Sequence, residues 1–220
     1  MRRKVILSLT LLISVVVLMV NACGQPPVLP AGEVEATEFL GTKLTPIRDQ
    51  GNNALKGTQH LDRETYKLTV DGLVENPLTL SYDDLLSYPM ESRLITLNCV
   101  EGWEFTAKWT GPRLAGILRD TKVNSGANTV IFHTADTAAY TSLELGYILE
   151  KGIIIAFKLN DVTLPPERGF PFQVIAEGKY GYKWAKWVTR IELSGDKDFR
   201  GFWESEGYSN QADVGGPAFD

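Results

Sequence analysis

The chain carries Leu94-Ile95-Thr96-Leu97-Asn98-Cys99-Val100-Glu101-Gly102-Trp103 near its middle, a strand-like run that ends in a cysteine among polar and flexible positions. The only other cysteine, Cys23, closes an apolar N-terminal stretch. If that stretch is an export signal, Cys99 is an unpaired thiol in a compartment where disulfides form. Three interpretations are then open: a small buried apolar residue, a nucleophile or a metal ligand. The polar neighbours at a strand end favour chemistry over packing.

The first 23 residues have the features of a bacterial lipoprotein signal. Met1-Arg2-Arg3-Lys4 is basic, an apolar run continues to Val20, and Ala22 precedes Cys23. The run is long for a signal and short for a membrane span. A small residue before a cysteine here resembles a lipobox, in which the cysteine is diacylated; an uncleaved anchor is the alternative. Both place the rest outside the cytoplasm, in a periplasm-like compartment and attached to a membrane. The paired arginines resemble a twin-arginine signal, and the general secretory route stays open.

Composition divides the chain into a signal peptide at residues 1–22, a flexible tether at 23–45 and one folded domain at 46–220. The tether is assigned because it is rich in Pro, Gly and Glu without a sustained hydrophobic period. The net charge of −5 becomes about −8 once the three basic residues of the signal are removed. This argues against nucleic acid as a partner. An anionic cofactor would need a local cluster of donors.

Hydrophobic periodicity predicts short strands and short helices in irregular order. Ser81-Tyr82-Asp83-Asp84 has the spacing of a capping box before a short helix. Strands are predicted at 66–70, 93–97, 129–133 and 153–158, helices at 85–87, 114–119 and 142–150, and further segments at 169–175 and 187–193. This mixture predicts a single α+β domain and not a doubly wound sheet.

Several motifs that would assign a function are absent from the sequence. There is no Cys-x-x-Cys, which excludes thioredoxin-like chemistry, attached c-type haem and cysteine-ligated iron–sulfur clusters. The chain has two histidines and no metalloprotease, phosphate-loop, dinucleotide or nucleophile-elbow motif. Any chemistry must therefore centre on Cys99. As a nucleophile it would need a base, for which His133 is the candidate with Asn98 or Asn160 to orient it; a core histidine is the alternative for His133.

Five motifs in order resemble one known family. They are Tyr66-x-Leu68-x-Val70-x-Gly72-Leu73-Val74-Glu75-Asn76-Pro77, Asn98-Cys99-Val100-Glu101-Gly102-Trp103, Trp109-Thr110-Gly111, Gly169-Phe170-Pro171, and Lys179-Tyr180-Gly181-Tyr182-Lys183 with Lys186-Trp187. Together they resemble the oxidoreductase molybdopterin-binding domain of sulfite oxidases and, more closely, of periplasmic methionine sulfoxide reductase catalytic subunits. The resemblance spans about Asn52 to Leu193 and implies a sulfite oxidase-like molybdopterin-binding fold.

The resemblance implies a role for each matching residue. In the family the cysteine gives its thiolate to molybdenum beside two dithiolene sulfurs, a role that falls to Cys99 and suits a soft ligand. The other implied cofactor contacts are Asn52, Leu55, Lys56, Thr134, Trp184, Ala185 and Lys186, with Lys179 and Lys183 as nearby donors. These lysines would supply the local positive cluster.

The chain departs from the sulfoxide reductase pattern around Gly-x-Pro, where it has Arg168 and Gln173 in place of asparagine and arginine. Either Arg168 still reaches the cofactor from across the loop, or it is a solvated loop charge. Arg168 and Gln173 are both taken as cofactor contacts implied by the resemblance. Glu101 and Arg168 are the candidate substrate-side catalytic residues. The aromatic tail Phe199, Phe202, Trp203 and Tyr208 is interpreted as packing and not as part of the catalytic site.

The resemblance further implies a monomer with one molybdenum-molybdopterin and no haem. Electrons would pass to or from a separate carrier, such as a membrane or soluble cytochrome. The implied reaction is two-electron oxygen-atom transfer on a small S- or N-oxide or a sulfite-like substrate. The alternatives are a metal-free binding lipoprotein on the same fold and a cysteine-nucleophile hydrolase.

Overall fold

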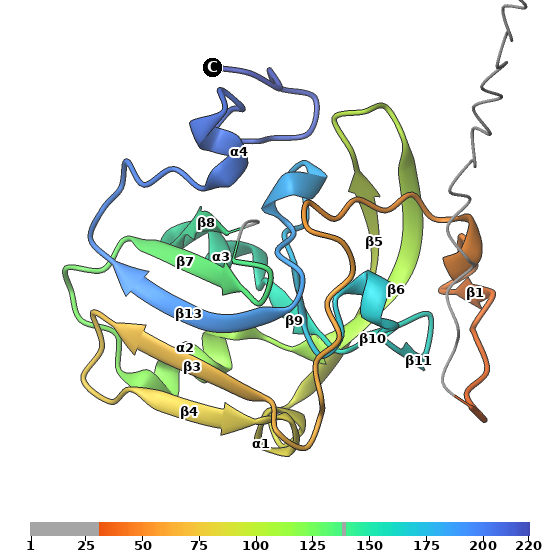
Figure 1. The fold of residues 1–220 in the computed structure, drawn as a ribbon, viewed down its shortest axis with the longest axis horizontal. Helices are drawn as coiled ribbons and strands as arrows, with labels where there is room; N and C mark the ends of the chain where they lie inside the picture. The colour runs from red at the N-terminus through yellow and green to blue at the C-terminus, as the bar shows by residue number, and fades with distance from the viewer. Residues whose placement is uncertain (1–30, 138–139) are drawn as a thin grey trace, which may run out of the picture.

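The fold is seen in a computed structural model that describes residues 31–137 and 140–220 (Figure 1). The strands are β1 (Glu38–Phe39), β2 (Thr42–Lys43), β3 (Lys67–Gly72), β4 (Leu78–Ser81), β5 (Met90–Asn98), β6 (Glu104–Pro112), β7 (Thr129–Thr134), β8 (Thr141–Glu144), β9 (Ile154–Ala156), β10 (Lys158–Leu159), β11 (Val162–Thr163), β12 (Gln173–Ile175) and β13 (Val188–Ser194). The α-helices are α1 (Tyr82–Leu86), α2 (Leu114–Thr121), α3 (Leu145–Lys151) and α4 (Phe202–Ser205). Three 3-10 turns join them, η1 (Ile47–Asp49), η2 (Pro166–Arg168) and η3 (Gly181–Lys183). The predicted α+β class is confirmed.

Two larger sheets enclose the core. One has five strands in the order β4-β3-β13-β7-β8, and the other has four in the order β11-β10-β6-β5. Within the five-stranded sheet β13 pairs in parallel with β3 and antiparallel with β7. Alternate residues of the strands point inward, so that Leu68 and Val70 from β3 and Trp109 from β6 are buried in one hydrophobic cluster. Burial of this apolar surface is the main term that holds the sheets together.

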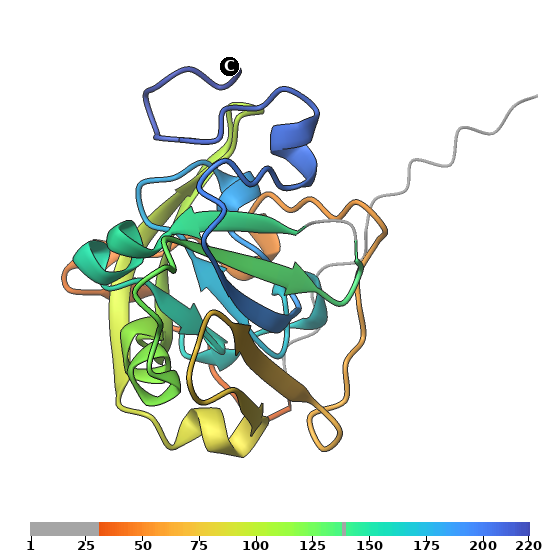
Figure 2. The same ribbon diagram turned by 90° about the vertical axis from the view of Figure 1, so that its left-hand side faces the viewer.

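The hairpin of β5 and β6 carries the stretch from Leu94 to Trp103. It pairs from Met90 with Pro112 to Asn98 with Glu104. Figure 1 and Figure 2 place its tip at the same end of the molecule as the C-terminal segment with α4. The connection of this hairpin therefore lies where it can meet residues from the end of the chain.

The predicted capping box is confirmed, whereas one predicted helix is wrong in part. The Ser81 hydroxyl accepts the Asp84 N–H at 3.1 Å and the Asp84 carboxylate accepts the Ser81 N–H at 2.8 Å, at the start of α1. The helix predicted at 142–150 is instead strand β8 followed by helix α3. Its first part pairs antiparallel with β7, with Thr141 opposite Phe132, because the buried edge of the five-stranded sheet needs a partner there.

The folded part begins before the predicted residue 46. The Glu35 carboxylate accepts the Ile47 N–H at 2.7 Å and the Asn160 amide at 2.9 Å. Glu33 accepts the hydroxyl of Thr163 at 2.8 Å. Glu33 and Glu35, both half-buried, thus hold part of the segment predicted as a tether at 23–45 against the domain. The predicted signal and Cys23 lie outside the described residues.

Candidate functional site

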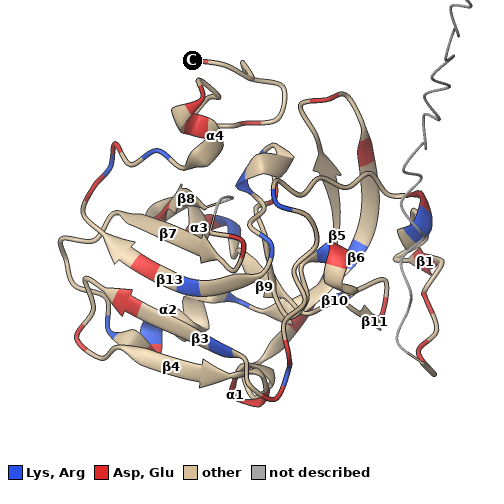
Figure 3. Cartoon of the chain, viewed as in Figure 1, with Lys and Arg blue, Asp and Glu red and all other residues tan. Residues whose placement is uncertain are grey.

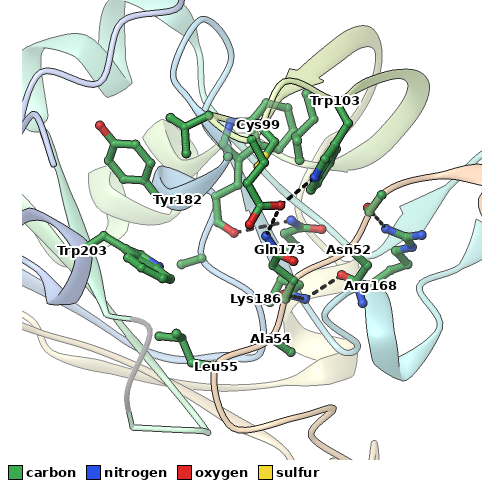
Figure 4. Close-up of a pocket in the computed structure, with 18 of the residues that line it drawn as sticks. Asn52, Ala54, Leu55, Cys99, Trp103, Arg168, Gln173, Tyr182, Lys186 and Trp203 are labelled. Carbon is green, nitrogen blue, oxygen red and sulfur yellow. Dashed lines mark hydrogen bonds between the residues drawn. The ribbon is translucent and has the colours of Figure 1, made fainter. Parts of the chain in front are cut away.

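A pocket of about 420 Å³ lies between the tip of the β5–β6 hairpin, residues 51–55, the segment 181–187 and the C-terminal segment (Figure 4). Nine of the twelve predicted site residues line it, namely Asn52, Leu55, Cys99, Glu101, Arg168, Gln173, Trp184, Ala185 and Lys186. The structure therefore brings together residues that lie up to 134 positions apart in the sequence.

Cys99 enters the pocket from the turn that closes the hairpin. Its N–H donates to the Trp103 carbonyl at 2.9 Å, and the Gly102 N–H donates to the Cys99 carbonyl at 3.0 Å. Gly102 has φ +88°, a left-handed conformation that glycine adopts without strain. The thiol is half-buried, and this burial raises its pKa, a larger effect than the lowering by the nearby N–H groups of Glu101 and Val100. A thiol with a raised pKa is a poor nucleophile at neutral pH.

Arg168 is buried and is not a solvated loop charge. It lies in η2, and its side chain donates to three backbone carbonyls of the facing loop, those of Ile47 at 3.1 Å, Gln50 at 2.6 Å and Gly51 at 2.6 Å. Its Nε is buried without a hydrogen-bond partner among the described residues. Burial lowers the pKa of Arg168 to about 10, so the group stays charged at neutral pH. Arg168 thus fixes the loop that leads to Asn52, while its Nε–H makes no hydrogen bond among the described residues.

Lys186 holds the same loop from the other side. Its Nζ donates to Asn52 Oδ1 at 2.8 Å, to the Asn53 carbonyl at 2.5 Å and to the Glu167 carbonyl at 3.2 Å. Burial, and after it the nearby Arg168 guanidinium, lower the pKa of Lys186 to about 7. A nearby anion would raise the pKa of Lys186 again and so favour its protonated, positively charged form.

Glu101 joins the loop to the hairpin turn. Its Oε2 accepts the Trp103 indole N–H at 2.9 Å and the Asn53 amide at 3.1 Å, and these two hydrogen bonds lower the pKa of Glu101 in that order. Both hydrogen bonds of Glu101 lie at the solvent-exposed surface. Gly51 faces the same indole so closely that a Cβ there would lie 2.5 Å from the ring, which explains why this position is a glycine. Glu101 therefore positions the two segments that flank Cys99.

Three predicted cofactor contacts lie outside this pocket, namely Lys56, Thr134 and Lys183. Lys56 is exposed beyond the lining residue Leu55. Thr134 is buried at the end of β7, and its hydroxyl donates to Asp136 Oδ1 at 2.6 Å. Asp136 does line the pocket. Thr134 thus reaches the pocket only through Asp136.

The lysines expected to form a positive cluster are paired instead with acidic residues. Lys183 Nζ is almost fully buried 2.5 Å from Glu204 Oε1, and Lys179 Nζ lies 2.6 Å from Asp213 Oδ1. Lys183 does not line the pocket, and its charge is neutralised by a partner that only the tertiary fold supplies. Its role as a cofactor donor stays a prediction. Arg168 and Lys186 are the cations among the described residues that line the pocket.

His133 is not close to the thiol as a catalytic base would be. Its Nε2 lies 2.8 Å from Glu192 Oε2 and 3.2 Å from Arg190 Nη1, on the strands of the five-stranded sheet. Figure 3 shows charges of both signs along β13 and β3, where this network lies. The histidine is explained by this network and does not line the pocket with Cys99.

The sequence reasoning missed the aromatic wall of the pocket. Tyr182, Trp203 and Tyr208 all line it, although the tail was interpreted as packing. The signal available in the sequence was the density of aromatic residues after residue 199. What could not be seen was that α4 folds back over the 181–187 segment.

Comparison with known proteins agrees with this site. Residues 55–203 match the family described as oxidoreductase molybdopterin binding domain. The chain is 33% identical over 153 residues to the oxidoreductase YuiH of Bacillus subtilis, which covers 69% of this chain and 76% of that protein. It is 31% identical over 171 residues to the protein-methionine-sulfoxide reductase catalytic subunit MsrP of Ralstonia nicotianae, with 71% of this chain and 49% of the relative covered. It is 27% identical over 168 residues to the MsrP of Campylobacter jejuni, with 69% and 56% covered.

A solved structure shares the fold. The sulfane dehydrogenase SoxCD from Paracoccus pantotrophus superimposes with a TM-score of 0.67 at 23% identity, over 70% of this chain and 44% of that chain. The present chain spans about half the length of the two MsrP subunits and somewhat less of the SoxCD chain. The family match covers more than half of the chain, and it includes the hairpin, the thiol and most of the pocket lining, although Asn52 and Tyr208 lie outside it. The chain therefore belongs to the oxidoreductase molybdopterin-binding domain family and has the sulfite oxidase-like fold.

Proposed function

We propose that this protein is an extracytoplasmic, membrane-anchored molybdenum oxidoreductase that transfers an oxygen atom to or from a small S- or N-oxide or sulfite-like substrate. The observation that carries the proposal is that the Cys99 thiol shares one pocket with Asn52, Arg168 and Lys186. Cys99 is the proposed metal ligand, and the other three lie where a bulky anionic cofactor needs amide and cationic donors.

The residues of the pocket fit molybdopterin. A thiol is the soft ligand that such a metal prefers, and a volume of about 420 Å³ is in the range of cofactor sites. The buried Arg168 Nε lacks a partner, and an unsatisfied buried donor is a place where a ligand acceptor is favoured. Lys186 offers a positive charge beside it. The proposed contacts are Cys99 to the metal and Asn52, Leu55, Lys56, Thr134, Arg168, Gln173, Trp184, Ala185 and Lys186 to the rest of the cofactor, with Thr134 acting through Asp136.

When bound, the cofactor would supply two-electron chemistry at molybdenum. In the reducing direction an oxide loses its oxygen as water, taking up two electrons and two protons, and its sulfur or nitrogen is reduced. A separate carrier, such as a membrane or soluble cytochrome, is the proposed electron donor. The chain's own residues hold the site: Arg168 and Lys186 fix the loop at Asn52, and Glu101 ties that loop to the turn of Cys99.

The structure gives two reasons to prefer this proposal over the thiol hydrolase. His133 is engaged with Glu192 and Arg190, and burial raises the pKa of the Cys99 thiol. Both features oppose activation of a nucleophile by a neighbouring base. A hydrolase would predict rapid alkylation of Cys99 by iodoacetamide in the purified protein, whereas a metal-bound thiolate would resist.

The membrane attachment is proposed through lipid on Cys23. It rests on the basic start, the apolar run and the Ala22-Cys23 pair of the sequence. Within the described residues 31–137 and 140–220, every helix is too short or too polar to cross a bilayer.

The proposal is tested by metal analysis and an assay panel. Protein matured in a host that makes molybdopterin should contain about one molybdenum per chain, and Cys99→Ser should lose the metal or the activity. Sulfoxides and N-oxides are assayed with reduced benzyl viologen, and sulfite with ferricyanide. Correctly matured protein that lacks molybdenum would overturn the proposal in favour of the metal-free binding protein.

A further inference from the structure

We propose that Tyr182, Trp203 and Tyr208 form a substrate subsite, here called the aromatic subsite, which receives the apolar group of a neutral sulfoxide or N-oxide. The inference rests on the proposed function and narrows its substrate class. It also assigns a binding role to the C-terminal segment.

The pocket has two chemically different sides. Figure 4 shows Tyr182 and Trp203 on one side and Asn52, Arg168 and Lys186 on the other, with Cys99 between them. The polar side carries the donors that fit the cofactor. The aromatic side lines the same pocket as the thiol, away from those donors.

The aromatic subsite is formed of rings that hold one another in place. Tyr182 and Tyr208 meet edge to face with centroids 5.3 Å apart, and Trp203 and Tyr208 do so at 5.2 Å. The Tyr182 hydroxyl donates to the Ser209 carbonyl at 2.8 Å, so its polar end is already satisfied. All three side chains are half-buried. Such rings offer apolar faces at low entropic cost, which suits an apolar ligand group.

A buried ion pair joins the segment that carries the aromatic subsite to the rest of the domain. Glu204, next to Trp203 on α4, lies 2.5 Å from Lys183, next to Tyr182 on η3, and neither side chain is more than 1% exposed. The Thr141 hydroxyl donates to the same Glu204 oxygen at 2.5 Å, and Lys183 also donates to Asn210 at 3.0 Å. A helix of four residues has little stability alone. The ion pair therefore sets the position of the aromatic wall relative to Cys99.

The charge around the subsite favours a neutral ligand. The cations among the described lining residues, Arg168 and Lys186, lie on the opposite side of the pocket. The nearest charge on the Cys99 turn is Glu101, and Figure 3 shows acidic colour at the tip of the hairpin. An anion such as sulfite would enter without a counter-charge and beside a carboxylate, which is unfavourable. A neutral oxide with an apolar substituent meets neither penalty.

The test compares matched substrates on the molybdenum-loaded protein. Methyl phenyl sulfoxide and dimethyl sulfoxide are both neutral and differ in the apolar group, while 4-(methylsulfinyl)benzoate adds a negative charge. Steady-state reduction with benzyl viologen is measured for the wild type, Trp203→Ala and Trp203→Phe. Phe202→Ala is the matched control, because Phe202 packs on Trp203 within α4 and does not line the pocket. Binding of methyl phenyl sulfide, the reduced product, is measured by calorimetry, which requires no turnover.

We expect Trp203→Ala to raise KM for methyl phenyl sulfoxide about tenfold with kcat nearly unchanged, and to leave both constants for dimethyl sulfoxide within about twofold. Trp203→Phe should recover most of the loss, Phe202→Ala should behave as the wild type, and the benzoate should be a poor substrate. An equal loss for both sulfoxides, no loss for either, or a preference for the benzoate would overturn the inference. If only sulfite turns over, the inference is overturned and the proposed function stands. If no oxide is reduced and sulfite is not oxidised either, the proposed function fails, and the calorimetry still decides the subsite: sulfide binding that Trp203→Ala weakens supports it, and binding that is absent or unaffected overturns it.

Discussion

Lys186 Nζ donates to the Oδ1 of Asn52 at 2.8 Å, joining two residues that are 134 positions apart. Arg168 grips the carbonyls just before Asn52, so two cations hold one loop against the pocket. Together with the hydrogen bond from Asn53 to Glu101, these side chains hold the loop in position. Arg168 and Lys186 therefore have two roles: they fix the shape of the pocket and they supply its positive charge.

The lowered pKa of Lys186 predicts a pH-dependent stability in the cofactor-free protein. Its pKa is about 7 in the folded state and 10.5 in the unfolded chain, so the unfolded state binds more protons between these values. The free energy of unfolding should therefore rise with pH across this window, relative to Lys186→Met. We expect a gain of about 1 to 3 kcal/mol from pH 7 to pH 10, reduced from the full shift because Nζ keeps three oxygen acceptors and some solvent. Urea unfolding measures it, and the exposed Lys56→Met is the control. If the free energy of unfolding changed with pH in the same way for the wild type and Lys186→Met, the prediction would be contradicted.

Arg168 should be needed for the shape of the cofactor site. Arg168→Lys keeps the charge but loses the planar fork that spans three carbonyls. We expect a loss of about 2 kcal/mol in unfolding free energy and a severalfold fall in molybdenum content. Arg48→Lys, at an exposed position of the same region, is the control. The measurements are urea unfolding and metal analysis, and full molybdenum loading of Arg168→Lys would show that the fork is dispensable.

Local signals in the sequence predicted some of the elements that local interactions decide. The strand predicted at 93–97 is part of β5, and α1 followed from Ser81 with Asp84 three positions on, whereas β6, the hairpin partner of β5, was not predicted. The predicted helix at 142–150 failed at its start because Thr141 and Ser142 pair with β7, a contact that periodicity in a short polar run does not reveal.

The site was predictable where residue type alone implied a role, as for the lone Cys99. It was not predictable where the role depends on a distant partner. Lys183 and Lys186 are both lysines of one segment, yet the first is paired with Glu204 and the second faces the pocket. The two lysines differ because the C-terminal segment folds so that Glu204 reaches Lys183 and not Lys186. The same segment places Trp203 on the pocket wall.

The buried pair of Lys183 and Glu204 predicts a strong double-mutant coupling. Lys183→Met leaves a buried carboxylate without its cation, and Glu204→Leu leaves a buried ammonium without its anion. Each single change should lower the free energy of unfolding by about 3 to 5 kcal/mol, whereas the double change should recover much of the loss. Urea unfolding of the four proteins gives the coupling. Additive losses would show that the two charges do not interact.

The contacts of Glu33 limit how far a lipid on Cys23 would let the domain move. Glu33 is hydrogen-bonded to Thr163 of β11 and lies only ten positions after Cys23 in the sequence. A fully extended chain of that length spans at most about 35 Å, so the domain would stay close to the bilayer surface and near a membrane-bound electron carrier. We expect Cys23→Ser to move the protein from the membrane fraction to the soluble fraction, with molybdenum content and viologen-linked activity retained. Equal membrane retention of wild type and Cys23→Ser would instead support the uncleaved anchor, and retention would then be lost on deleting the apolar run that ends at Val20.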